Sequence, residues 1–148
     1  KTKSKHQDGG GILMKITVPG YAQPWKRQGA AGKFRWTDSK KMAAHKGLII
    51  LEARNAIKDT KPLTGAVWLS VTIFRAIPKA FGKKKRSLAI EGIELPTSRP
   101  DLDNQIKLIK DALTGSGVCW VDDSQVCRLD ALKRYGEIER TEIIITEI

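Results

Sequence analysis

Residues 99–125 read RPDLDNQIKLIKDALTGSGVCWVDDSQ, and this stretch decides the fold. Pro100 disfavours helix at the residue before it, whereas short aspartate side chains suit the first turn of a helix. Beyond them, apolar residues recur at steps of four, three and four, at Leu102, Ile106, Ile109 and Leu113. This spacing is the buried stripe of an amphipathic helix. We therefore predict a helix that begins near residue 102 and is ended by Gly115 and Gly117.

A second face of the predicted helix is polar, with Asp103, Lys107, Lys110 and Thr114. Lys107 stands one turn above Asp103, because an α-helix has about 3.6 residues per turn. After the glycines, the short apolar run at 118–121 predicts a strand that ends at Asp122 and Asp123. A helix, a turn and a strand in this order are expected to bring both ends of the unit together, with the polar face looking into a cleft.

The unit contains four aspartates, Asp101, Asp103, Asp122 and Asp123, in a strongly basic chain. Carboxylates brought together resist joint ionisation unless a cation lies among them, so the cluster is a candidate metal site. Oxygen ligands favour a hard ion such as Mg²⁺ or Mn²⁺. Taken singly, however, an Asp-x-Asp motif is typical of a helix cap with a solvated acid, and Asp-Asp-Ser is typical of a turn.

Composition points to a polyanionic partner. The 148 residues include 27 Lys and Arg against 16 Asp and Glu, for a net charge of +11, which favours nucleic acid. No apolar run is long enough to span a membrane and no signal peptide is evident, so we expect a cytoplasmic protein. The two thiols, Cys119 and Cys127, are expected to be buried and reduced.

Residues 1–13 predict a flexible basic arm or a non-native remnant, and residues 14–148 a single domain. A first strand is expected from Met14 until Pro19 ends it. Thr37 or Ser39 is expected to cap a helix that runs to about Lys58, with its inward face at Met42, Ile49, Ala53, Ala56 and Ile57.

Period-two alternation at 67–74 predicts a central strand covered on both faces. Residues 126–135 and 139–148 predict two antiparallel strands that turn at Gly136. The expected fold class is α+β, with a small mixed sheet packed against two main helices.

Two basic segments are candidate DNA-binding elements. Residues 21–36 mix glycines, aromatic residues and cations, and residues 83–86 read KKKR within a predicted short helix or lid. The alternative for both is an ordinary solvated surface. The candidate DNA-binding residues are Lys26, Arg27, Lys33, Arg35, Lys83, Lys84, Lys85, Arg86, Arg99 and Lys110.

Three motifs, DLDN at 101–104 followed by Lys107, DALTG at 111–115 and WVDDSQV at 120–126, together resemble the RusA family of Holliday junction resolvases, many of them prophage-encoded. The resemblance implies that Asp101, Asp103 and Asp123 bind Mg²⁺ and are catalytic, together with Lys107. It also implies a RusA-like fold, a homodimer, and four-way junctions or other branched DNA as substrate. Some members carry arginine directly before the first aspartate, whereas Pro100 stands there in this chain.

We therefore expect a Mg²⁺-dependent, structure-specific DNA endonuclease that resolves Holliday junctions by paired symmetric nicks, with Mn²⁺ as the substitute ion. The alternative is a non-catalytic basic DNA-binding module in which the aspartates serve only as helix caps and solvated surface charges. A metal-dependent nucleotidyltransferase also uses Asp-x-Asp, but the chain lacks a glycine-serine nucleotide loop before the aspartates.

Overall fold

The computed structural model describes residues 11, 13–27 and 39–148. Its elements follow the order β1 (Leu13–Pro19), α1 (Lys40–Ala56), β2 (Val67–Ala76), α2 (Lys83–Ile90), α3 (Leu102–Ser116), the short 3-10 helix η1 (Asp123–Gln125), β3 (Val126–Gly136) and β4 (Arg140–Glu147). The predicted α+β class is confirmed, since a mixed sheet packs against helices. The predictions for Lys33, Arg35 and most of residues 1–13 lie outside the described residues.

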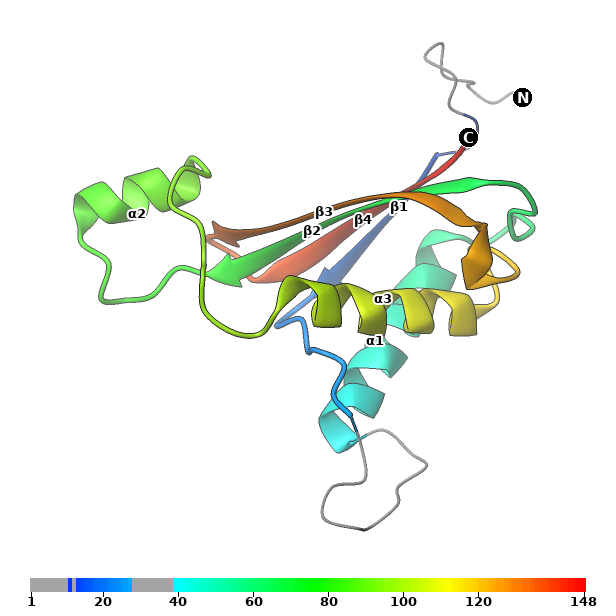
Figure 1. Ribbon diagram of the computed structural model, residues 1–148, viewed down its shortest axis with the longest axis horizontal. Helices are drawn as coiled ribbons and strands as arrows, with labels where there is room; N and C mark the ends of the chain where they lie inside the picture. Colours follow the sequence, from blue (N-terminus) through cyan, green and yellow to red (C-terminus); the bar gives the residue numbers. More distant parts are fainter. Residues whose placement is uncertain (1–10, 12, 28–38) are drawn as a thin grey trace.

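The four strands form one sheet in the order β1-β4-β2-β3 (Figure 1). β4 pairs antiparallel with both β1 and β2, whereas β3 pairs parallel with β2. The predicted pairing of 126–135 with 139–148 across a turn at Gly136 is therefore wrong. The apolar strand β2 takes an inner position, so β3 and β4 pair with its two edges instead of with each other.

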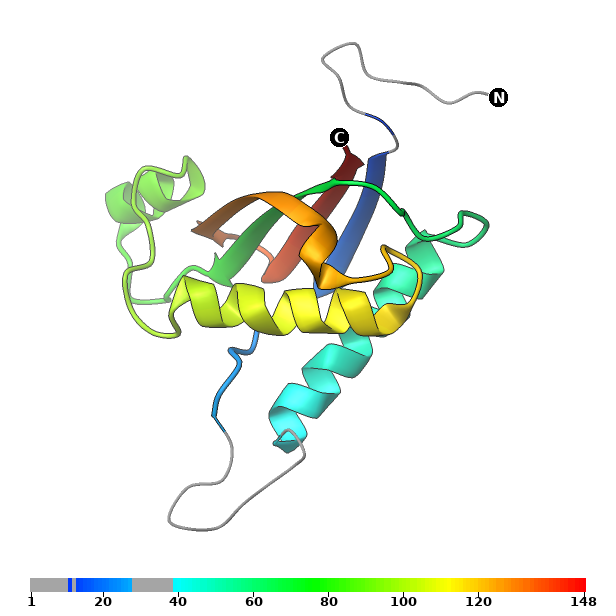
Figure 2. The same cartoon turned by 45° about the vertical axis from the view of Figure 1, so that its right-hand side comes forward.

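Only one face of the sheet carries helices, because α1 and α3 lie together on the same side (Figures 1 and 2). Val67, Leu69, Val71 and Ile73 of β2 point to that side and are buried. The alternate residues of β2, such as Trp68 and Phe74, are only half-buried. The expectation that both faces of this strand would be covered is wrong. The remaining helix, α2, lies beyond the end of the sheet and does not cover its second face.

Helix α1 begins as predicted at Ser39, whose Oγ accepts a hydrogen bond from the Met42 amide at 3.2 Å. It ends at Ala56, a little earlier than expected, with Ile57 as the capping residue. The predicted inward residues are buried except Ala56, which is exposed. Of the cysteines, Cys119 is buried as predicted, but Cys127 is exposed on β3.

None of the helices in these described ranges has the length and apolar character needed to cross a bilayer. Helix α2 contains the KKKR run at 83–86, for which a short basic helix or lid was predicted.

Stability is expected to fall in mild acid because of His45 on α1. Its side chain is buried, and its Nε2 finds no hydrogen-bond partner in the part of the chain that the structure describes. Burial lowers the pKa of His45 below its usual 6.5. The unfolded chain therefore takes up the proton first, so stability present above pH 6.5 is lost as the pH falls toward the folded-state pKa.

Urea unfolding at a series of pH values between neutral and mildly acidic measures this loss. His45→Leu is expected to flatten the pH dependence over that window, whereas equal slopes for the variant and the parent protein would contradict it.

Candidate active site

Helix α3 places the first two aspartates. Asp101 is the residue before the helix, and Asp103 lies in its first turn. The predicted apolar stripe is confirmed, since Ile106, Ile109 and Leu113 are buried in the core. The helix is capped by Gly117 in the left-handed conformation (φ 75°), where a side chain would be strained. Gly117 therefore ends the helix as predicted, whereas Gly115 lies inside its last turn and does not.

The strand predicted at 118–121 does not form. Trp120 makes only an isolated bridge with Leu63, and its side chain is buried. The indole Nε1 of Trp120 donates a hydrogen bond to Oγ1 of Thr114 at 2.8 Å. This hydrogen bond fixes residues 118–121 against the last turns of α3. The chain then continues into η1 instead of forming a strand.

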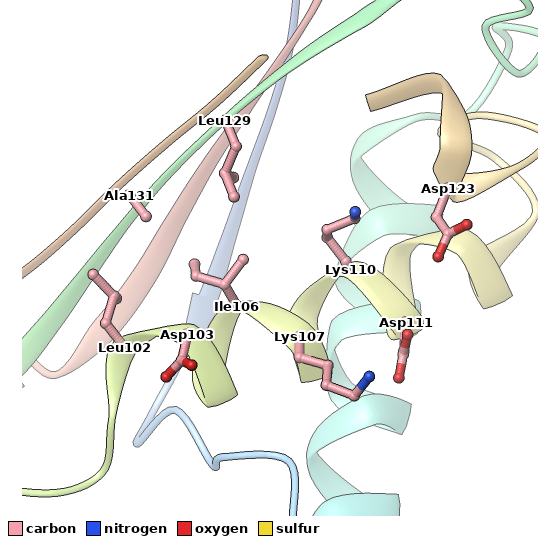
Figure 3. A pocket seen from close by; sticks show the side chains of 9 residues that line it. All are labelled: Leu102, Asp103, Ile106, Lys107, Lys110, Asp111, Asp123, Leu129 and Ala131. Atoms are coloured by element: carbon pink, nitrogen blue, oxygen red, sulfur yellow. The ribbon is translucent and has the colours of Figure 1, made fainter. Parts of the chain in front are cut away.

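A groove of 570 Å³ runs between α3 and the edge strand β3. Its charged residues are Asp103, Lys107, Lys110 and Asp111 of α3 and Asp123 of η1, and its apolar wall is Leu102, Ile106, Leu129 and Ala131. The prediction that Asp103, Lys107 and Lys110 share a face that opens into a cleft is confirmed. Asp103 and Asp123 lie toward opposite ends of the groove, with Lys107 between them (Figure 3).

Lys107 is held by an aromatic side chain from a distant part of the sequence. Its Nζ lies 4.7 Å from the centroid of the Trp25 ring, within range of a cation–π interaction. The Trp25 amide donates to the carbonyl of Asn104 at 2.9 Å, which fixes this segment to α3. The contact restrains the ammonium group at the groove.

The two adjacent aspartates before β3 have different surroundings. The carboxylate of Asp122 accepts hydrogen bonds from the hydroxyl and the amide of Ser124, and these bonds lower the pKa of Asp122. The Gln125 side chain in turn accepts from the Asp122 amide at 2.8 Å, which completes a capping box. Asp122 is thus engaged as a helix cap, whereas Asp123 lines the groove.

Asp101 lines a different cavity. This second cleft, of 430 Å³, is lined by Tyr21, Gln23, Pro24, Trp25, Lys26, Lys41, Arg99, Pro100, Asp101 and Asn104. One wall is fixed by the buried Gln105, whose Nε2 donates to the carbonyl of Ala22 at 2.8 Å.

The three predicted metal ligands, Asp101, Asp103 and Asp123, do not converge within one chain. In the residues that the structure describes, no three His, Cys, Asp or Glu side chains lie close enough together to hold a metal ion. Carboxylate oxygens are the donor type that Mg²⁺ prefers, but this arrangement does not fit a single ion.

The candidate DNA-binding cations are spread over several elements. Lys26, Arg27 and Arg99 are exposed near the second cleft, and Lys110 lines the groove. The basic residues 83–86 lie on α2, where Lys85 Nζ is 4.4 Å from the Phe81 ring centroid. α2 stands apart from α3 at the far end of the sheet (Figure 1), so its DNA-binding role stays a prediction.

Sequence reasoning placed Trp25 in the candidate DNA-binding segment 21–36 but did not predict its contact with Lys107. It missed Asp111 and the apolar wall formed by Leu129 and Ala131. Asp111 lies four residues after Lys107, so the helical period already assigns it to the same face. No local signal indicates the contact of Trp25 with Lys107, because Trp25 lies 82 residues before Lys107 in the sequence.

The fold and the groove together define a small basic α+β protein whose carboxylates and lysines suit hydrolysis of a phosphodiester backbone. The family model described as endodeoxyribonuclease RusA matches residues 18–146, and the chain belongs to this family. It is accordingly a nuclease that hydrolyses phosphodiester bonds. Nucleases of this type generally need a divalent metal ion.

Two relatives are similar to this chain. The uncharacterized protein YqaN of Bacillus subtilis (strain 168) is 37% identical over 119 residues, which cover 79% of this chain and 82% of that protein. The crossover junction endodeoxyribonuclease rusA of Lactococcus phage r1t is 44% identical over 80 residues, which cover 54% of this chain and 53% of the phage protein.

Proposed function

We propose that this protein resolves four-way DNA junctions by a pair of symmetric nicks, in a hydrolysis that depends on Mg²⁺ and accepts Mn²⁺ as a substitute. The observation that carries the proposal is the groove that presents Asp103, Asp123 and Lys107 in a chain of the RusA family. The junction-cleaving activity named for the phage relative supports the choice of substrate.

Each groove residue has a distinct part in this chemistry. The Lys107 ammonium, restrained over Trp25, stabilises negative charge on the scissile phosphate or orients the attacking water. Lys110 adds a second positive charge in the same groove. The family resemblance proposes Asp101, Asp103 and Asp123 as ligands of the divalent ion, although they are not grouped around one ion within a single chain and Asp101 lies outside the groove. When bound, the ion would supply a Lewis acid and an activated water.

A homodimer follows from the shape of the substrate. A four-way junction offers two equivalent strands to cut, and a closed two-fold assembly presents two equivalent sites to them. The net charge of +11 favours association with the DNA backbone. The alternative of a non-catalytic DNA-binding module loses its basis, because the chain belongs to an endonuclease family.

Incubation with an end-labelled synthetic four-way junction, with and without Mg²⁺, tests the proposal. We expect nicks at symmetric positions in two opposing strands only when the ion is present, and intact linear duplex of the same sequence. Cutting of the linear duplex at the same rate would remove the junction specificity, and an uncut junction would remove the function.

Lys107→Gln is expected to slow nicking on the order of 100-fold, because it removes a charge that stabilises the transition state. Junction affinity measured without metal should change little, since one of many cations is lost. Lys15→Gln on β1, at the opposite edge of the sheet from β3, removes the same charge and is the matched control. Equal slowing by both variants would show that only the overall charge matters.

A further inference from the structure

The second cleft, beside the groove, has the lining of a nucleotide site. Its volume of 430 Å³ is within the range of pockets that hold one small ligand, roughly 300 to 1,000 Å³. Two aromatic side chains, Tyr21 and Trp25, line it together with three cations, Lys26, Lys41 and Arg99. Aromatic rings stack on bases and cations bind the backbone, and proteins combine the two where they bind unpaired nucleic acid.

The charges of the cleft favour an anionic ligand. The three cations outnumber the one carboxylate in the lining, that of Asp101. The side chains of Lys41 and Arg99 are exposed, and neither forms an ion pair with another residue that the structure describes. Both are therefore available to a phosphate group.

Gln23 and Asn104 add hydrogen-bonding groups to the same lining. Asn104 uses its backbone carbonyl to accept from the Trp25 amide at 2.9 Å. The carboxamides of Gln23 and Asn104 are half-buried and make no hydrogen bond within the described ranges. A carboxamide both donates and accepts, as the edges of bases do, so these two side chains can bind a base by its edge.

The aromatic wall of the cleft is already fixed without a ligand. Residues 21–26 are bonded to α3 through the Trp25 amide and through the buried side chain of Gln105. They are bonded to α1 through the Lys26 amide, which donates to Sδ of Met42 at 3.4 Å. Binding therefore costs little ordering of this wall, and preorganisation of this kind raises affinity.

Trp25 is shared between the cleft and the groove. Its ring lines the cleft, and the Nζ of Lys107, which lines the groove, lies 4.7 Å from the centroid of the same ring. Asn104 of the cleft directly follows Asp103 of the groove in the first turn of α3. The two sites therefore adjoin, and a nucleotide in the cleft lies next to a phosphate held at Lys107.

We propose that the second cleft binds an unpaired nucleotide of the strand that is cut, beside the scissile phosphate, an inference that rests on the proposed junction cleavage and deepens it. The base packs against the rings of Tyr21 and Trp25. Lys41 and Arg99 hold the adjoining phosphate. Strands that exchange between the arms of a junction turn away from their neighbours, so a base there unstacks at lower cost than inside a linear duplex. A cleft that takes this base favours cutting at the branch point.

Photochemical crosslinking locates the nucleotide without requiring cleavage. A synthetic junction carries one 5-iododeoxyuridine, placed in turn at each position around the point of strand exchange, and its complex with the wild-type protein is irradiated without Mg²⁺. Because 5-iodouracil couples to aromatic rings that it contacts, we expect the crosslink in the tryptic peptide 16–26, which contains Tyr21 and Trp25. The strongest crosslink should come from a nucleotide that adjoins the mapped nick.

Crosslinks found only at other aromatic residues would overturn the proposal. Trp68 on the open face of the sheet and Phe81 near α2 are the internal controls, since each lies beside a cation, Arg128 or Lys85, but outside the cleft. The absence of a crosslink at every position would overturn it equally.

An abasic nucleotide at the crosslinked position gives a second readout. Removal of one stacked base is expected to slow nicking by the wild-type protein about 10- to 100-fold. The double variant Tyr21→Leu/Trp25→Leu should cut the intact junction slowly and be slowed no further by the abasic nucleotide, because both changes remove the same contact. An equal abasic penalty for the double variant and the wild-type protein would contradict the proposal.

Tyr21→Leu alone keeps the test independent of folding and of Lys107. The Tyr21 ring is 38% exposed, and the contact of Trp25 with Lys107 stays intact in this variant. Its abasic penalty should be smaller than that of the wild-type protein. Trp68→Leu is the matched control and should retain the full penalty, and an abasic nucleotide far along the same arm should slow neither protein.

The results separate the two proposals. Wild-type protein that crosslinks through peptide 16–26 but leaves junctions uncut keeps the nucleotide site and removes the proposed function. Wild-type nicking with crosslinks only outside this peptide removes the nucleotide site and leaves the junction activity in place.

Discussion

Asp123→Asn is expected to reduce junction nicking about 1,000-fold, whereas Asp122→Asn retains the parent rate. The side chain of Asp123 lines the groove, and asparagine there loses the charge that holds a divalent cation. The side chain of Asp122 caps η1, and asparagine is an equally good cap. Asp103→Asn should match the loss at Asp123, because both carboxylates belong to the same proposed site.

Single-turnover nicking of a labelled junction measures these rates, and a binding assay without metal shows that each variant still recognises DNA. Asp122→Asn is the matched control, since it removes the same charge from the neighbouring residue. A loss at Asp122 as large as that at Asp123 would contradict the assignment of the two roles.

Trp120→Ala is expected to lower the free energy of unfolding by about 3 to 5 kcal/mol. The Trp120 side chain is 1% exposed, and truncation leaves a cavity between α3 and the segment before η1. It also removes the indole hydrogen bond to Thr114. Because Trp120 fixes the chain only three residues before Asp123, the variant should lose nicking activity together with stability.

Chemical denaturation followed by circular dichroism measures the change. Trp120→Phe fills most of the same volume but lacks the indole N–H, so its loss should be smaller, about 1 to 2 kcal/mol. A loss below about 1 kcal/mol for Trp120→Ala would contradict the view that this side chain anchors the segment.

The elements with a clear period were predictable from sequence. The spacing of Ile106, Ile109 and Leu113 gave the buried face of α3, and the alternation in β2 gave its buried face. These patterns are local, so they specify an element without its neighbours. The same helical period brought Asp103 and Lys107 to one groove.

Contacts between distant parts of the chain were not predictable in this way. The run at 118–121 has strand-like composition, but Trp120 is buried, with its indole bonded to Thr114 and its backbone bridged to Leu63. These contacts with residues outside the run replace the predicted strand. The strand order depends on β2 lying between β3 and β4, which no local pattern specifies. The different roles of Asp122 and Asp123 depend on hydrogen bonds to Ser124 and Gln125 that appear only once η1 forms.

The strand order also constrains how the protein folds. Both neighbours of β2 in the sheet follow α3 in the chain, since β2 ends at Ala76 and β3 begins at Val126. β1 can pair only after β4, the last strand in the chain, has formed, because β4 is its only neighbour in the sheet. α1 and α3 form from local contacts, whereas the sheet requires closure of long loops, which costs chain entropy before any strand is paired. We therefore expect slow folding on the millisecond-to-second scale, in which the helices form early and the strands of the sheet pair last.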